Sequence, residues 1–207
     1  MTTREIVVRG HVPSDHVIQL FDTSDTRAEA IADFLSEGYR KGEALLLVIS
    51  SQNWERVVQR LHDAGVPIDA ALASGALTVL DAGKILERCL RNGRPDVALF
   101  EASLGPAVRG VAASGKPSRI YGELVDLLAA EGDFHSVQLL EDLWNNLCDQ
   151  LGFSLFCGYS AAHFGDPRSA DSLQSICRSH SLVRANSRDL LGSFLVAAVA
   201  GRSTLAD

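Results

Sequence analysis

The architecture of the chain can be inferred outward from residues 16–50, which read HVIQLFDTSDTRAEAIADFLSEGYRKGEALLLVIS. Two apolar runs, 16–21 and 44–50, have the length of strands, and the second is typical of a strand buried on both faces. Between them, Thr26 and Glu29 have the spacing of a capping box, which predicts the start of a helix. A helix that connects two strands in this way indicates parallel pairing.

The alternation of strands and helices continues through most of the chain. Further strands are predicted at 77–80, 118–121 and 153–159, with helices between them. One of these helices is expected to begin at Pro95 and to continue to Gly115. The predicted fold class is therefore α/β, with three layers and a mainly parallel sheet flanked by helices.

The length of the chain, 207 residues, is sufficient for one compact domain. We expect this domain to cover residues 15–207 and residues 1–14 to form a loose N-terminal arm. Residues 187–200 are expected to close it as an amphipathic helix, which either covers the domain's own sheet or supports self-association.

The charge and the apolar pattern exclude several classes of protein. Nineteen basic and 26 acidic residues give a net charge of −7, so we expect no direct contact with nucleic acid. No apolar run approaches the roughly 20 residues that span a bilayer, and the N-terminus has no signal-peptide core. The four cysteines include no Cys-x-x-Cys pair and are expected to be reduced thiols of a cytoplasmic protein.

The turn after the first strand, residues 21–27, is where an open parallel sheet would bind a phosphate. A phosphate-binding loop needs glycines and a lysine followed by a hydroxyl residue, and this turn has neither. Instead, Asp22 and Asp25 would repel a phosphate. Because the sequence also lacks a Gly-x-Ser-x-Gly turn and any recognisable catalytic set, we expect no enzyme activity.

Seven segments, in order along residues 16–182, carry a resemblance to a known family. They are His16–Asp22, Phe34–Glu43, Gly75–Ala82, Tyr121–Val125, Leu140–Asn145, Phe153–Tyr159 and Ile176–His180. Together they resemble the MEDS family, the sensory domain of methanogen and methylotroph regulators such as the dichloromethane-responsive repressor DcmR. Residues 32–48 are also similar to KaiC/RecA-like ATPases, with the P-loop (Walker A motif) lost.

The resemblance implies a non-catalytic sensor domain for signal transduction or transcription regulation. In the family such a domain is often attached to a DNA-binding, histidine-kinase or anti-sigma-type module, and no output segment of this kind is visible here. A small organic effector would occupy the former nucleotide crevice and signal to such a partner protein or through a homodimer face. The alternative is a nucleotide-binding or residual-enzyme domain of KaiC-like descent.

The candidate ligand-binding residues include those near the carboxyl ends of strands, where ligands of open α/β sheets bind. The full set is His16, Phe21, Tyr121, Glu123, Glu141, Asn145, Cys157, Tyr159 and His180.

Several of these residues also have a purely structural interpretation. His16 could cap a strand or turn, and Glu123 could stabilise the start of a helix. Glu141 and Asn145 share a helix face and could pair with an arginine such as Arg119. Cys157 could act as a small hydrophobic side chain.

Cys177 and His180 are three residues apart on an expected helix, which is close enough for them to share a metal. With Cys157 or His163, they could bind zinc or iron. Nothing in the sequence fixes the third and fourth ligands, so no metal and no other cofactor is predicted.

Overall fold

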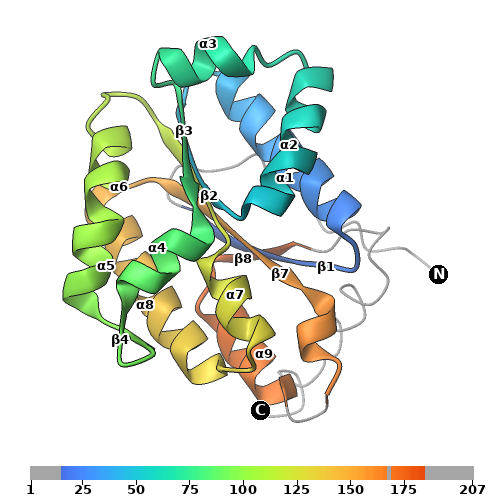
Figure 1. Cartoon of the computed structure of the whole chain (residues 1–207), viewed down its shortest axis with the longest axis vertical. Helices are drawn as coiled ribbons and strands as arrows, with labels where there is room; N and C mark the ends of the chain where they lie inside the picture. Colours follow the sequence, from blue (N-terminus) through green and yellow to red (C-terminus); the bar gives the residue numbers. More distant parts are fainter. Residues whose placement is uncertain (1–14, 167–168, 185–207) are drawn as a thin grey trace.

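A computed structural model describes residues 15–166 and 169–184 and contains a six-stranded parallel sheet in the order β3-β2-β6-β7-β1-β8. The strands are β1 (His16–Phe21), β2 (Ala44–Ile49), β3 (Leu77–Asp81), β6 (Ser118–Gly122), β7 (Ser154–Ser160) and β8 (Leu182–Arg184). Helices lie on both faces of this sheet (Figure 1). The predicted three-layer α/β fold is thereby confirmed.

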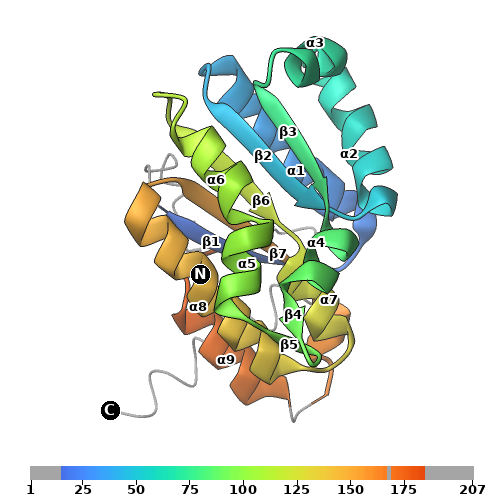
Figure 2. The same cartoon turned by 60° about the vertical axis from the view of Figure 1, so that its left-hand side comes forward.

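The helices divide into two groups, one on each face of the sheet (Figures 1 and 2). One face carries α1 (Ser24–Arg40), α2 (Ser51–Asp63) and α3 (Ile68–Ala73). The other carries α4 (Ala82–Cys89), α5 (Val97–Ser103), α6 (Gly105–Ala112), α7 (Leu124–Ala130), α8 (Phe134–Leu151) and α9 (Ala170–Arg178). Because successive strand residues point to opposite faces, β1 packs Val17 and Phe21 toward α1 and Ile18 and Leu20 toward α8.

The helix α1 begins earlier than the sequence predicts. Its cap is Thr23, whose hydroxyl accepts a hydrogen bond from the backbone N–H of Thr26 at 3.2 Å. Thr26, predicted to open a capping box with Glu29, therefore lies inside the first turn. Since β1 ends at Phe21, only Asp22 and Thr23 separate the strand from the helix.

The segment around Pro95 also differs from its prediction. Pro95 lies in a short antiparallel hairpin, β4 (Leu90–Arg91) and β5 (Arg94–Pro95), instead of starting a helix. The turn residues Asn92 and Gly93 have φ values of 52° and 77°, as a tight hairpin turn of this kind requires. The helical region that follows breaks at Leu104 because Pro106 has no N–H to continue the ladder.

The strand β8 was not predicted, and it pairs with β1. Just before it, the backbone N–H of Ser181 donates to the carbonyl of His16 at 2.9 Å. The Ser181 hydroxyl accepts from the N–H of His16 at 2.9 Å and donates to the same carbonyl at 3.0 Å. These bonds fasten the end of the described chain to the beginning of β1.

The predicted loose arm at 1–14 and terminal helix at 187–200 lie outside the described residues. Among the helices of the described part, none has the length and apolar character that crossing a bilayer requires.

Candidate functional site

The nine candidate residues lie in two places. Phe21, Tyr121 and Glu123 lie at the carboxyl ends of β1 and β6, where Arg27 and Asp126 join them, and we call these five residues the edge network. The other six lie between the sheet and α8, and we call them the histidine cluster: His16, Glu141, Asn145, Cys157, Tyr159 and His180.

The carboxylate of Glu123 is the anchor of the edge network. It accepts hydrogen bonds from the Ser50 backbone N–H at 2.8 Å and hydroxyl at 3.1 Å, and from the side-chain amide of Asn53. Although Glu123 directly precedes α7, its side chain makes no capping hydrogen bond to that helix. The prediction that Glu123 stabilises the start of a helix therefore does not describe its main contacts. These contacts, with Ser50 and Asn53, hold α2 against the end of β6.

Arg27 occupies the centre of the edge network. Its buried guanidinium lies 2.6 Å from Asp126 and 3.4 Å from Glu123. Asp126 also accepts from the backbone N–H of Ser160 at 2.7 Å and lies 3.1 Å from the ring of His163. Burial alone would raise the pKa of Asp126, but hydrogen bonds from His163 and Arg27 and the charge of Arg27 outweigh burial and lower it.

The hydroxyl of Tyr121 lies beside Arg27 on the α1 face of the sheet. It is fully buried and has no hydrogen-bond partner among the described residues. A Cβ built on Gly158 would lie 2.9 Å from this hydroxyl and 3.0 Å from the Phe21 ring, so only glycine leaves room for both. The Phe21 and Tyr121 rings both contact Phe156 edge-on. Phe21, Tyr121 and Phe156 therefore form an aromatic cluster, and the Tyr121 hydroxyl within it has no hydrogen-bond partner among the described residues.

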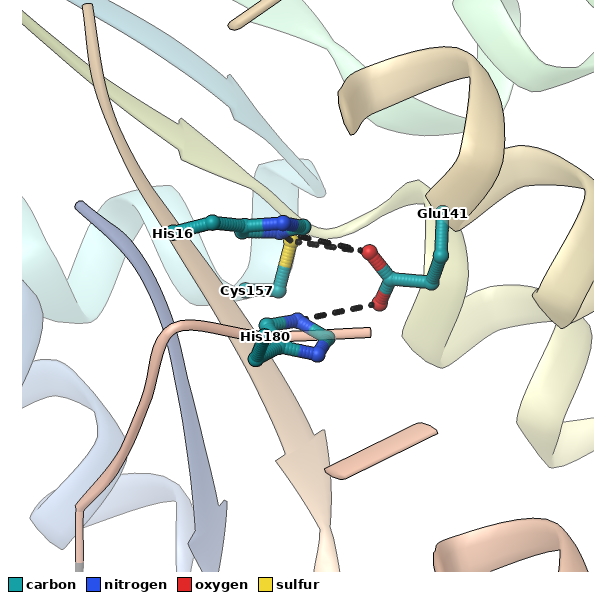
Figure 3. Close-up of side chains that lie close together, drawn as sticks. All are labelled: His16, Glu141, Cys157 and His180. Carbon is teal, nitrogen blue, oxygen red and sulfur yellow. Dashed lines mark hydrogen bonds and ion pairs between the residues drawn. The ribbon is translucent and has the colours of Figure 1, made fainter. Parts of the chain in front are cut away.

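The histidine cluster brings four potential ligand groups to one point (Figure 3). The Nε2 atom of His16 lies 3.2 Å from the Cys157 sulfur and 3.3 Å from Glu141 Oε2. The Nε2 atom of His180 lies 3.4 Å from Glu141 Oε1, which also accepts from the Tyr159 hydroxyl. Glu141 and Cys157 have no exposed surface, and His16 and His180 are also buried.

The other ring nitrogen of each histidine has its own partner. His16 Nδ1 lies 2.7 Å from the side-chain oxygen of Asn145, whose NH₂ group donates to the carbonyl of Ser179 at 3.1 Å. His180 Nδ1 lies 2.7 Å from the carbonyl of Ile176. Burial lowers the pKa of His180 to about 4, so its ring is neutral at pH 7.

Several sequence-based interpretations of these residues are wrong. Arg119 forms ion pairs with Glu37 and Glu43, so it is not the arginine partner that was predicted for Glu141. His180 follows the end of α9 at Arg178, so it does not share a helix with Cys177.

The ligand partners suggested for His180 are likewise corrected in part. His163 belongs with Asp126 and not with the histidine cluster. Within the described chain, Cys157 and His180 belong to a group of side chains that lie close enough together to hold a metal ion, and Cys177 does not belong to it. Arg27, Asn53 and Asp126 were missed, because their importance depends on charges that are close only in the folded chain.

Comparisons with known proteins were made by family and by individual sequence. A search of curated proteins finds no match to this chain. A scan against family models matches residues 15–181 to the model described as "MEDS: MEthanogen/methylotroph, DcmR Sensory domain". The match includes both the edge network and the histidine cluster, while the descent from KaiC/RecA-like ATPases stays a prediction. The chain therefore belongs to the MEDS family of sensory domains.

Proposed function

We propose that this chain is a cytoplasmic, non-catalytic sensor that binds a small organic effector at the edge network and signals to a regulatory protein. Membership of a sensory-domain family supports the regulatory role. The observation that carries the effector site is the buried hydroxyl of Tyr121, which has no hydrogen-bond partner in the described part of the chain and lies near the carboxyl edge of the sheet. Ligands of open parallel sheets bind at this edge.

The chemistry around Tyr121 favours an uncharged effector with one hydrogen-bond acceptor. A buried hydroxyl without a partner costs about 1–3 kcal/mol, which an acceptor on the effector would recover. Phe21 and Phe156 would contact its apolar part. Two carboxylates, Glu123 and Asp126, disfavour a phosphate group, which argues against the alternative of a nucleotide site.

The edge network also offers a way to transmit binding. Arg27 connects α1 to α7 through Asp126, and Glu123 connects α7 to the start of α2 through Ser50. An effector that takes over one of these bonds would favour a different position of the helices, which is a shift between two states. The receiver would be a kinase, an anti-sigma factor, a DNA-binding regulator or a second copy of this chain.

The test is a thermal-shift titration with short-chain alcohols, ketones and chlorinated alkanes. We expect a ketone or alcohol to raise the Tm of the wild type, and Tyr121→Phe to weaken its binding by about tenfold, equivalent to ~1.4 kcal/mol. The matched control is Tyr39→Phe, on the half-exposed C-terminal part of α1, which should bind as the wild type does.

Two results would contradict the proposal. One is a set of effectors that bind Tyr121→Phe and the wild type equally well. The other is magnesium-dependent hydrolysis of ATP or GTP that Glu123→Gln abolishes, because this would establish the residual-enzyme alternative.

A further inference from the structure

The histidine cluster contains the ligand types that Zn²⁺ binds in proteins: imidazole nitrogen, thiolate sulfur and carboxylate oxygen. One such atom from each of His16, Glu141, Cys157 and His180 lies within 4.8 Å of every other. Ligands at 2.0–2.3 Å from a tetrahedral centre are separated by roughly 3.3–3.6 Å. His16 Nε2 lies 3.2 Å from Cys157 Sγ and 3.3 Å from Glu141 Oε2, which are close to those edges, and Cys157 Sγ lies 3.8 Å from the same oxygen. His180 Nε2 lies 3.4 Å from the other oxygen, Oε1.

The outer hydrogen bonds identify the donor nitrogen of each ring. The amide of Asn145 donates to Ser179, so its oxygen faces His16 Nδ1, which must be the donor. The carbonyl of Ile176 can only accept, so His180 Nδ1 is also a donor. The other nitrogen of each ring, Nε2, lies toward Glu141 inside the cluster (Figure 3).

This arrangement leaves a buried polar atom without a partner. His180 Nε2 lies 3.4 Å from a carboxylate oxygen of Glu141, and it has no hydrogen-bond partner among the described residues. Both side chains are completely buried. A cation bound between the two atoms would give this nitrogen a partner. Histidines that bind metals show the same pattern, because they usually donate their other N–H to a carbonyl, a carboxylate or water.

We infer that His16, Glu141, Cys157 and His180 bind one Zn²⁺ ion as a closed, four-ligand site. The ligands come from β1, α8, β7 and the segment between α9 and β8, so the ion would tie the last described segment to the middle of the sheet. Four protein ligands leave no position for a reacting water, which makes the site structural. The site is on the opposite face of the sheet from Tyr121 and does not depend on the proposed effector.

The test uses the full chain without an affinity tag. Zinc content by mass spectrometry should be one ion per chain, and replacement by Co²⁺ should give visible absorption of tetrahedral cobalt with a thiolate-to-cobalt charge-transfer band. Cys157→Ser should abolish that band. The matched control is Cys177→Ser, whose thiol lies outside the cluster, and it should retain both the band and one metal per chain.

A second variant keeps the test decisive if loss of a ligand unfolds the chain. Asn145→Ala removes the hydrogen bonds to His16 and to the Ser179 carbonyl but none of the four ligands, and it should weaken Zn²⁺ affinity by about 10–100-fold in competition with a chelator. Folded wild type, checked by circular dichroism, that neither contains nor takes up Zn²⁺ or Co²⁺ would overturn the inference. Unchanged metal content in Cys157→Ser would also overturn it. Either result leaves effector binding at Tyr121 unaffected.

Discussion

Arg27 is the residue whose replacement tests the edge network most directly. The change Arg27→Met keeps most of the side-chain volume and the contact with the Phe21 ring, but it removes the positive charge between Asp126 and Glu123. Two buried carboxylates then lose their shared cation. The free energy of unfolding should fall as a result.

The size of the effect follows from the burial of all three groups. Removing one partner of a buried ion pair costs about 3–5 kcal/mol, because the remaining charge is left without compensation. For a chain of this length, each kcal/mol shifts Tm by about 2–4 °C, so the expected loss is roughly 6–20 °C. The matched control is Arg56→Met, whose exposed pair with Asp25 should contribute less than about 1 kcal/mol.

The pH dependence of the lost stability shows whether Arg27→Met acts by removing the charge or by disturbing the packing. In the wild type the pKa of Asp126 is lowered, so its contribution to stability is present above its unfolded pKa and is lost only in stronger acid. Arg27→Met removes the charge and the hydrogen bond of Arg27 that help to lower the pKa of Asp126, so this pKa should rise and the folded variant should take up a proton at a higher pH than the wild type does. The difference between wild type and variant should therefore shrink as the pH falls.

Urea unfolding followed by circular dichroism, at half-unit steps between pH 5 and pH 7.5, measures this difference. The reasoning is refuted if Arg27→Met loses no more stability than Arg56→Met. It is also refuted if the loss is the same at both ends of the pH range, since lost packing alone would have that signature.

Two further predictions concern glycines and thiols. A Cβ at Gly38 would lie 2.8 Å from Leu45 and 2.9 Å from Arg119, so Gly38→Ala should cost about 1–3 kcal/mol in urea unfolding. Gly110, in α6, has no atom within 4 Å of the same position, and Gly110→Ala should gain about 0.5–1 kcal/mol; equal effects at both sites would contradict the geometry. Half-buried Cys177 should react with iodoacetamide before the buried Cys157, although burial raises the pKa of both thiols. Equal reaction rates of the two thiols in peptide mapping would contradict this prediction.

The parts of the fold that could be predicted are those with a local signal. The apolar run at 44–50 and the helical spacing before it reflect burial of the segment itself, so the parallel sheet could be inferred. The strand β8 has only three residues, and it exists because β1 lies beside it. The pair Asn92 and Gly93 is a local signal for a hairpin turn, but a helix that begins at Pro95 would leave no second strand for such a hairpin.

The six residues of the histidine cluster could be selected from the sequence, but their arrangement could not. Cys157 and Tyr159 were expected in the same crevice as Tyr121, whereas Cys157 contacts His16, 141 positions away. The alternation of β7 separates them from Tyr121, since Phe156 faces α1 while Cys157 and Tyr159 face α8. Arg27 gave no signal because its partners, Glu123 and Asp126, are 96 and 99 positions away.

The bonds between His16 and Ser181 have a consequence for how this domain can be joined to others. The family match begins at residue 15 and ends at residue 181, so its two ends lie side by side. From residue 181 the described chain continues into β8, which runs parallel to β1. A polypeptide joined before residue 15 would therefore begin next to the point where the chain enters β8. The rings of His16 and His180, tilted by 41° with centroids 3.9 Å apart, lie beside this point. A force on a polypeptide joined before residue 15 would therefore act directly on the histidine cluster.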